Sequence, residues 1–228
     1  MDYITQGLSQ AFILIATLNP EVVDITLRTL SITFTATLIA SIISVPLGLY
    51  ISFNNFFGKK TIISLIQTLY ALPTVVVGLL MYMLLSNKGP LGIFGLLFTP
   101  SGMIIGQTVL IIPIITGLTI AALSNLDPGI RDTARSLGAT VSQFFLSMLK
   151  EARFAILAAV VMGFSRAISE VGAAIMIGGN IRGQTRILTT TITLETGQGN
   201  FSLSIALGII LLLIALIVNM IVSYFQQR

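Results

Sequence analysis

The 228-residue chain contains no cysteine and no histidine. These absences exclude disulfides, thiolate nucleophiles, histidine bases and Cys/His metal sites, so we expect neither catalytic residues nor a metal site. Charged residues are also scarce, at 9%, whereas hydrophobic residues make up 55% and the mean hydropathy is +1.00. A water-soluble domain of this size would be far less apolar, and the composition therefore predicts an integral membrane protein.

Five continuously apolar stretches are long enough for transmembrane helices, each of which needs about 20 residues. They do not show the period-two alternation of membrane β-strands, so closed strands are not expected. We therefore predict an all-α integral membrane protein with five core transmembrane helices. The predicted spans are residues 27–52, 62–86, 102–124, 154–178 and 202–224.

The start of the chain has neither the basic region nor the small-residue cleavage site of a secretory signal. Its apolar run, residues 11–18, ends at Asn19-Pro20 and is too short to cross a bilayer. We expect residues 1–21 to form a short N-terminal interfacial or elbow helix. The alternative is a sixth span over residues 3–18, which would move only the N-terminus to the other side.

The basic residues predict the orientation of the spans. No Lys or Arg precedes Arg28, so the positive-inside rule gives no reason to keep the N-terminus in the cytoplasm. With that terminus outside, the membrane domain of residues 22–222 leads to a short cytoplasmic tail, residues 223–228. The outer side then carries Arg28, Lys88, Arg182 and Arg186, and the cytoplasmic side carries Lys59, Lys60, Arg131, Arg135, Lys150, Arg153 and Arg228.

The connection between the third and fourth spans, residues 124–153, is the longest on the cytoplasmic side. Asp127-Pro128 is typical of a helix start, and Gly138 is typical of a helix end. Two interpretations remain open: an amphipathic hairpin that lies on the membrane, or an element that docks in a groove of another protein. Its apolar positions near helical spacing are Ile130, Ala134, Leu137, Phe144, Phe145, Met148 and Leu149.

Arg166 and Glu170 are two charged residues inside the fourth predicted span. A charge at the bilayer centre costs roughly 2.5–3.5 kcal/mol on insertion scales, so such residues usually face protein or water and have a partner. Four residues apart, the two lie on one helix face and can form an ion pair. Small neighbours, including Gly172, permit close helix packing. We predict that the pair points inward, toward a neighbouring helix or a dimer axis.

Several segments resemble the permease subunits of type I ABC importers. Asp132-Thr133-Ala134, followed three residues later by Gly138, resembles their Glu-Ala-Ala-x-x-x-Gly loop, with Asp and Thr in place of Glu and Ala. The Ile-x-Leu-Pro end of that motif is not kept at residues 148–151. The segments 70–92 and 165–174 resemble molybdate, sulfate and tungstate permeases, and residues 178–219 are most similar to the tungstate-specific ones.

The resemblance covers roughly residues 22–222 and implies the type I ABC importer permease fold. It implies three kinds of partner: a second copy of the chain, two cytoplasmic ATPase subunits that bind ATP and Mg²⁺ and dock on the coupling loop of residues 124–153, and an extracytoplasmic binding protein that delivers the anion. This chain has no G-x-x-x-x-G-K-[ST] loop, because Phe53 stands at the first glycine position of the nearest string, Gly58–Thr61. We therefore expect a permease subunit without its own ATPase activity or cofactor, surrounded by lipid in the inner membrane of a prokaryotic-type cell and without a nucleic-acid partner.

Two pairs of residues are candidates for the transport pathway. Proline interrupts helical hydrogen bonding, so Pro73-Thr74 predicts a bend near the pathway. Thr33 and Thr37 belong to a stripe of hydroxyl side chains on the first span. Such a stripe lines a pathway or, more commonly, makes hydrogen bonds between helices.

Charged residues have two open interpretations each. Arg166 contacts a passing oxyanion, or it forms with Glu170 a structural ion pair near the gate, which is the interpretation that we favour because Glu170 would repel a dianion. Arg182 and Arg186 attract an anion or bind the delivery protein at the outer mouth, or they lie in a solvated loop with Arg186 near Glu195.

A permease subunit of an ATP-driven tungstate importer is the function we predict, with molybdate and sulfate as the nearest alternatives. An ATP-independent secondary transporter or channel is a weaker alternative, because five spans show no matched pair of interrupted helices. An intramembrane hydrolase using Ser165 or Ser169 would lack a histidine base.

Overall fold

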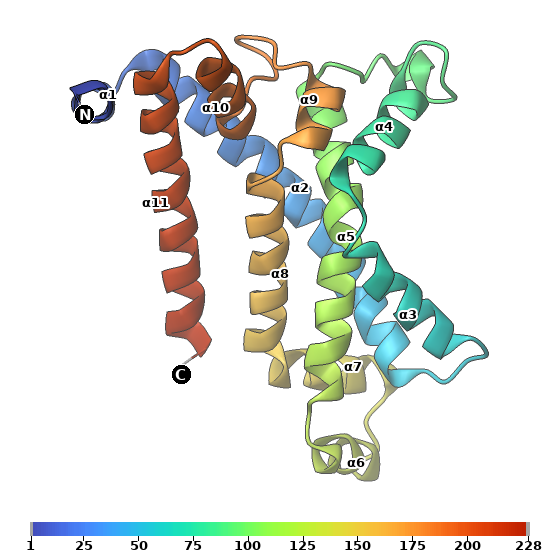
Figure 1. Cartoon of the computed structure of the whole chain (residues 1–228). Helices are drawn as coiled ribbons and strands as arrows, with labels where there is room; N and C mark the ends of the chain where they lie inside the picture. Colours follow the sequence, from blue (N-terminus) through green and yellow to red (C-terminus); the bar gives the residue numbers. More distant parts are fainter. Residues whose placement is uncertain (1, 227–228) are drawn as a thin grey trace.

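The computed structural model describes residues 2–226, and every regular element in that range is a helix (Figure 1). This confirms the all-α fold class. Long helices run between the two ends of the molecule, and some of the short helices lie across those ends. The elements are α1 (Asp2–Ala16), α2 (Pro20–Phe53), α3 (Lys59–Leu69), α4 (Thr74–Leu85), η1 (Gly92–Phe94), α5 (Pro100–Ser124), α6 (Pro128–Ser136), α7 (Val141–Glu151), α8 (Arg153–Ile168), α9 (Gly172–Gly178), α10 (Leu188–Gly197) and α11 (Phe201–Gln226).

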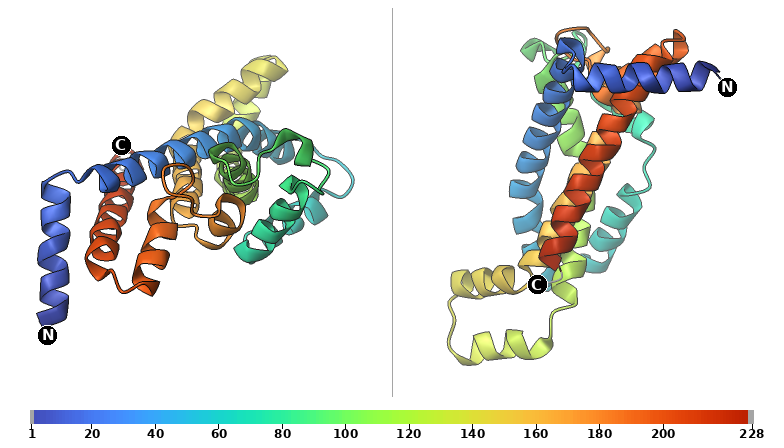
Figure 2. Two further views of the ribbon diagram at one scale, coloured as in Figure 1. Left: turned by 90° about the horizontal axis from the view of Figure 1, so that it is seen from above. Right: turned by 90° about the vertical axis from the view of Figure 1, so that its left-hand side faces the viewer.

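α1 lies across the direction of the long helices, at the same end of the molecule as α10 (Figure 2). It packs against the first two turns of α11, where Gln10 is hydrogen-bonded to Ser202 and Gly7 lies beside Ile205. A helix turned across the bundle in this way has the shape of an elbow helix, as expected for residues 1–21. Its depth in a membrane remains a prediction.

α2 begins earlier than the first predicted span. Asn19 accepts hydrogen bonds from the N–H groups of Glu21 and Val22, and Pro20 occupies the first helical position, where its missing N–H costs nothing. These two signals start the helix at Pro20, seven residues before the predicted span. The predicted boundary between residues 21 and 22 therefore falls inside its first turn.

Three helices, α2, α5 and α11, are long and apolar enough to cross a membrane. Two further pairs pass the same test together but are bent, α3 with α4 by 98° and α8 with α9 by 63°. Counting each bent pair as one span gives up to five, at the predicted places. Both bent pairs lie in predicted spans, at residues 62–86 and 154–178. The bend in the first was expected at Pro73, whereas the break in the second was not predicted. α11 also extends through residues assigned to the tail, while Arg228 lies outside the described residues.

Each break has a local cause. Pro73 has no N–H and restricts Leu72 to extended conformations, so a helix ends before it and a new one begins after it. Between α8 and α9 the chain leaves the helix at Ser169, and Glu170 folds its side chain back onto the first turn of α9. Figure 1 places both breaks between the two ends of the long helices.

The centre of the fold is the contact of α5 with α2, α8 and α9. Gly48 on α2 allows a close approach to α5, since a Cβ there would lie 2.7 Å from Cγ2 of Thr119. The buried core around α5 is apolar, and without water around the helices it is held mainly by van der Waals packing. Its members are Ala40, Val77, Met81, Leu85, Leu110, Ile111, Ile115, Ala167, Ala173 and Ile177.

α6 and α7 form a hairpin at the end of the molecule opposite α10 (Figures 1 and 2). Gly138 has φ +73° and ends α6 as predicted, and Ala139 N–H bonds to Ala134 O across the turn. Thr140 and Gln143 then start α7 with a reciprocal pair of cap hydrogen bonds. A buried cluster joins α7 to the ends of α2, α5 and α8 through Leu49, Leu123, Phe144, Met148, Ala152 and Ile156.

Candidate functional site

The break between α8 and α9 is organised by the Arg166–Glu170 pair. Arg166 Nη1 donates to Glu170 Oε2 at 2.8 Å, so the ion pair that the spacing predicts is present. Glu170 Oε1 accepts a hydrogen bond from Ala173 N–H at 3.0 Å, and Thr189 Oγ1 donates to the Glu170 carbonyl at 2.7 Å. One carboxylate oxygen thus binds the guanidinium, and the other caps the amino end of α9. A gating role for the pair remains a prediction.

The two members of the pair differ in exposure. Glu170 is 2% exposed, whereas the side chain of Arg166 is 35% exposed. The pair therefore has a buried end, which fixes α9, and an open end at the guanidinium. Gln107 reaches the same region from α5, where its Nε2 lies 3.5 Å from Ala167 O, while its buried Oε1 has no hydrogen-bond partner among the described residues.

The open end of the pair faces a cavity of about 280 Å³ at the break between α3 and α4. Thr74, the first residue of α4, lines it together with Tyr70, Pro113, Thr116 and Arg166. Most of the remaining wall is aliphatic. The sequence therefore placed the bend at Pro73-Thr74 correctly, and the structure adds that Thr74 and Arg166 share one cavity. Their part in transport remains a prediction.

Thr33 and Thr37 lie elsewhere, buried where α2 packs against the rest of the bundle. Thr37 Oγ1 donates to Thr33 O, and the Thr33 hydroxyl has no partner among the described residues. In the same stripe, Thr29 accepts from Leu188 N–H and Ser44 donates to Ile112 O. Within one copy of the chain this burial favours contacts between helices over lining of a pathway.

At the end occupied by α10, the predicted outer-loop arginines are engaged by carboxylates. Arg182 lies 2.8 Å from Glu21 at the start of α2, and Arg186 lies 3.8 Å from both Glu21 and Glu195. The Arg182 side chain is 72% exposed, but that of Arg186 is only 14% exposed. The contact of Arg186 with Glu195 is therefore present, and Arg182 is the more exposed of the two arginines. Binding of an anion or of a delivery protein by either arginine remains a prediction.

On the α6–α7 hairpin the four residues of the predicted coupling motif take different positions. Asp132 and Thr133 are exposed on α6, Ala134 packs against the buried cluster, and Gly138 forms the turn. Leu137 does not join the apolar face as expected, because it is 81% exposed at the end of α6.

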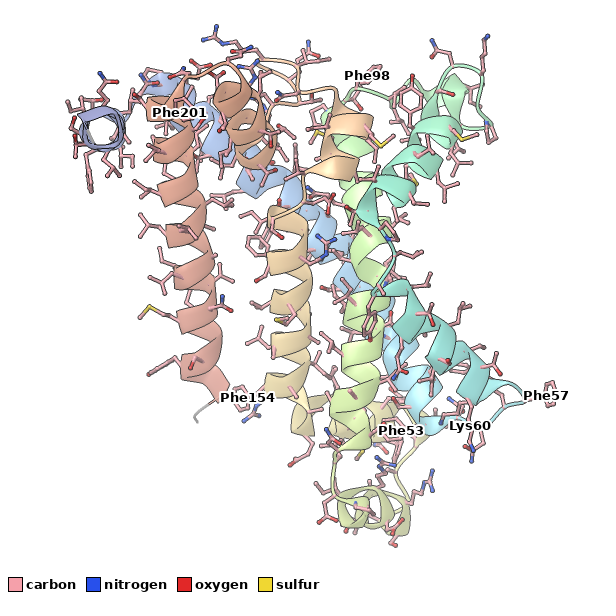
Figure 3. The ribbon with its side chains drawn as sticks, in the orientation of Figure 1. Phe53, Phe57, Lys60, Phe98, Phe154 and Phe201 are labelled. Carbon is pink, nitrogen blue, oxygen red and sulfur yellow. The ribbon has the colours of Figure 1, made fainter. Side chains whose placement is uncertain are left out.

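Two arginines that the sequence did not single out hold this hairpin. Arg131 Nη2 donates to Leu123 O at 2.8 Å, and its guanidinium lies 5.1 Å from the centre of the Phe53 ring. Arg135 lies 5.5 Å from the centre of the Phe144 ring. Figure 3 shows Phe53 at this lower end of the bundle. The hairpin is thereby tied to the last turns of α2 and α5.

Comparison with known proteins identifies the family of this chain. A family model described as binding-protein-dependent transport system inner membrane component matches residues 44–228. The chain belongs to this family. It is 37% identical to the tungstate uptake system permease protein TupB of Peptoclostridium acidaminophilum, with all of both chains covered. It is 38% identical to TupB of Campylobacter jejuni, with 97% of this chain and 92% of that one covered.

The fold of this family member is that of type I ABC importer permeases. A chain of the MetNI methionine ABC transporter in an inward-facing conformation aligns with a TM-score of 0.73, covering 92% of this chain and 96% of that one. At 17% identity, this likeness is one of fold. The predicted fold class is therefore confirmed for this family member.

Proposed function

We propose that the chain is the transmembrane subunit of an ATP-driven importer that translocates tungstate. The observation that carries this proposal is similarity along the whole chain, at 37% and 38% identity, to two permease proteins named for tungstate uptake. Membership of a binding-protein-dependent family supports an importer, because an external protein then delivers the cargo. Molybdate and sulfate are the alternative cargoes.

The partners follow from the two ends of the molecule. The α6–α7 hairpin offers exposed Leu137 and Val141 beside its turn, which suits insertion into a groove of an ATPase subunit. Those ATPases would bind ATP and Mg²⁺, and no ATP site is assigned to this chain. The opposite end, with α10 and the exposed Arg182, would receive the extracytoplasmic binding protein. A second copy of the chain would complete the transmembrane pathway.

The proposed orientation rests on the same assignment. The hairpin end carries Lys59, Lys60, Arg131, Arg135, Lys150 and Arg153, and we place it in the cytoplasm of a prokaryotic-type cell. The N-terminus then lies outside and the C-terminus inside. ATP-driven movement of the hairpin would reach α2 and α5 through Arg131 and the buried cluster around Phe144, and would alternate the bundle between inward-open and outward-open states.

Cellular uptake tests the proposal directly. Cells that express the ATPase and the binding protein, with and without this chain, would be supplied with tungstate, molybdate and sulfate, and accumulation measured by elemental mass spectrometry. Selective loss of tungstate accumulation without the chain is expected. Selective loss of molybdate or sulfate would assign the alternative cargo, and unchanged accumulation of all three would overturn the oxyanion importer.

A further inference from the structure

The two helix breaks differ in how the amino end of the second half-helix is satisfied. A helix start leaves N–H groups without partners inside the helix and carries partial positive charge. At α9 this end is capped by the protein itself, because Glu170 Oε1 accepts from Ala173 N–H. At α4 the cap position is Pro73, whose side chain accepts no hydrogen bond, and the N–H groups of Thr74 and Val75 have no acceptor among the described residues.

The carboxyl end of α3, on the other side of the same break, is in contrast satisfied. The N–H groups of Tyr70, Ala71 and Leu72 turn back to the carbonyls of Gln67, Thr68 and Leu69 at 3.1–3.4 Å. The electrostatic character of the break is therefore set by the free amino end of α4. That end lies beside the capped one, since Thr74 Oγ1 would lie 3.5 Å from a Cβ placed on Gly172 and Gly78 packs on Ala173.

A second observation in the same cavity points to an anionic ligand. Thr116 lines the cavity, is 1% exposed, and its hydroxyl has no hydrogen-bond partner in the part of the chain that the structure describes. A helical threonine ordinarily bonds to the carbonyl four residues back, but here Ile112 O accepts a hydrogen bond from Ser44. A buried hydroxyl without a partner is costly unless a ligand or water completes it.

Arg166 supplies the third donor group. Among the described residues its guanidinium makes one hydrogen bond, from Nη1 to Glu170, so the other N–H groups of the guanidinium remain available to a ligand in the cavity that Arg166 lines. Because Glu170 balances its charge, the site has nearly no net charge and would hold a dianion weakly. Weak binding is what a transport pathway needs, since a tightly held ion would not be released.

We propose that this cavity is a waypoint at which a tetrahedral oxyanion is held between the amino end of α4, the Thr116 hydroxyl and the Arg166 guanidinium. The oxyanion would accept hydrogen bonds from the amino end of α4, as the Glu170 carboxylate does at the amino end of α9. Half-helix amino ends that meet anionic cargo near the middle of a membrane are a known physical solution in transporters. This inference rests on the proposed function and names the residues that contact its cargo.

The test uses the assembled importer, with ATPase and binding protein, and compares isosteric variants. Thr116→Val removes the free hydroxyl and is expected to lower tungstate uptake about tenfold, as the loss of one hydrogen bond to a charged ligand would. The matched control is Thr119→Val on the same helix, where an equally buried hydroxyl also lacks a partner among the described residues but does not line the cavity. Uptake by that control is expected to equal uptake by the unmodified chain.

A second pair of variants tests whether a carboxylate of the protein itself can compete with the oxyanion for the amino end of α4. Pro73→Asp places a carboxylate on the free amino end of α4 and is expected to reduce uptake more than Pro73→Asn, which offers the same cap without the charge. ATP hydrolysis stimulated by the binding protein should persist in Thr116→Val and Pro73→Asp, whereas a merely structural defect would lower both readouts together.

The outcomes separate the waypoint from the function. If the unmodified importer accumulates none of the three oxyanions, the proposed function fails before the variants are compared. If it accumulates tungstate but Thr116→Val matches Thr119→Val, or Pro73→Asp matches Pro73→Asn, the importer stands and the waypoint is overturned. A parallel loss of uptake and stimulated ATP hydrolysis would also overturn it.

Discussion

Glu170 accepts hydrogen bonds from two directions, and this determines how the charge pair can be altered. One carboxylate oxygen meets Arg166 and the other caps α9 at Ala173 N–H. Removing Arg166 leaves a buried carboxylate without its counter-charge. We expect Arg166→Ala to cost about 1–3 kcal/mol, below the 3–5 kcal/mol typical of a fully buried pair, because the arginine side chain is 35% exposed.

A neutral acceptor at position 170 should recover part of this loss. The double variant Arg166→Ala with Glu170→Gln keeps an oxygen for Ala173 N–H and is expected to be more stable than Arg166→Ala alone. The charge swap, Arg166→Glu with Glu170→Arg, should not recover the lost stability. An arginine at position 170 has only N–H donors and could not accept the hydrogen bond from Ala173 N–H. Thermal unfolding of the purified variants in one detergent measures both comparisons. A swap as stable as the original pair would show that capping by residue 170 is unimportant.

Gly117 provides a second test at the scale of one residue. A Cβ there would overlap the Tyr70 hydroxyl, so the ring of Tyr70 rests directly on the backbone of α5 at the edge of the cavity. Gly117→Ala is expected to force Tyr70 away and to destabilise the protein by about 1–3 kcal/mol. Gly208→Ala is the matched control, because no heavy atom lies within 4 Å of its added Cβ, and it should be neutral or slightly stabilising.

The measurement is again thermal unfolding, with Tyr70→Ala as the relieving change. Adding it to Gly117→Ala should remove the clash, so the cost of the alanine should become small in that background. Equal melting temperatures for Gly117→Ala and Gly208→Ala would show that Tyr70 does not pack on α5.

At the scale of elements, the α6–α7 hairpin depends on Arg131 for its attachment to the bundle. The Arg131 side chain joins α6 to Leu123 O at the end of α5 and to the Phe53 ring at the end of α2. Arg131→Gln is expected to weaken this attachment by about 1–3 kcal/mol, since a charged hydrogen bond and a cation–π contact are lost. In the assembled importer, tungstate uptake per ATP hydrolysed should fall, and amide exchange of α6 should rise.

Arg135→Gln is the comparison variant for this prediction. The described contact of Arg135 is the longer one with the Phe144 ring, at 5.5 Å, so its effect should be smaller. Uptake per ATP that is unchanged in Arg131→Gln would show that movement of the hairpin reaches the bundle through the buried cluster alone.

The sequence predicted which elements exist better than it predicted their direction. Apolar runs predicted the helices and bent helix pairs that are long and apolar enough to cross a membrane. Asp127, Pro128 and Gly138 predicted the boundaries of α6, because caps and turns act through neighbouring residues. Hydropathy does not record direction, so the bends of 98° and 63° could not be predicted from it, although Pro73 marked one of them. The cap that Glu170 provides for α9 was missed because its spacing to Arg166 already suggested a continuous helix.

At the scale of the whole molecule, contacts between residues far apart in the chain could not be predicted from the sequence. Arg182 and Glu21 are 161 residues apart, and no local pattern connects them. Thr116 was not singled out either, because only the packed structure shows that its hydroxyl lacks a partner and shares a cavity with Thr74 and Arg166. Of the residues that line this cavity, the sequence marked Arg166 by its charge and Thr74 by the preceding proline, whereas only three-dimensional packing marks Thr116. A part of any of them in transport stays a prediction.

The orientation of the molecule is predicted by the unequal charge of its two ends. At the α10 end, Arg28, Arg182 and Arg186 are each held in an ion pair. The hairpin end has more basic residues, including exposed Lys60. Figure 3 shows Phe57 projecting there from the connection between α2 and α3, and Lys60 from the first turn of α3. Basic side chains free to meet anionic headgroups, with an aromatic ring at the interface, favour the cytoplasmic leaflet.

Because the chain contains no cysteine, single cysteines test this orientation without background labelling. Asn55 is exposed in the connection between α2 and α3, and Gln184 is exposed in a turn between α9 and α10, at the opposite end of the bundle. A membrane-impermeant thiol reagent should label Gln184→Cys in intact cells and label Asn55→Cys only after the membrane is opened. Uptake by both variants would verify that the labelled protein is assembled. The reverse labelling pattern would place the α6–α7 hairpin outside, where no ATPase could dock, and would overturn the proposed coupling together with the orientation.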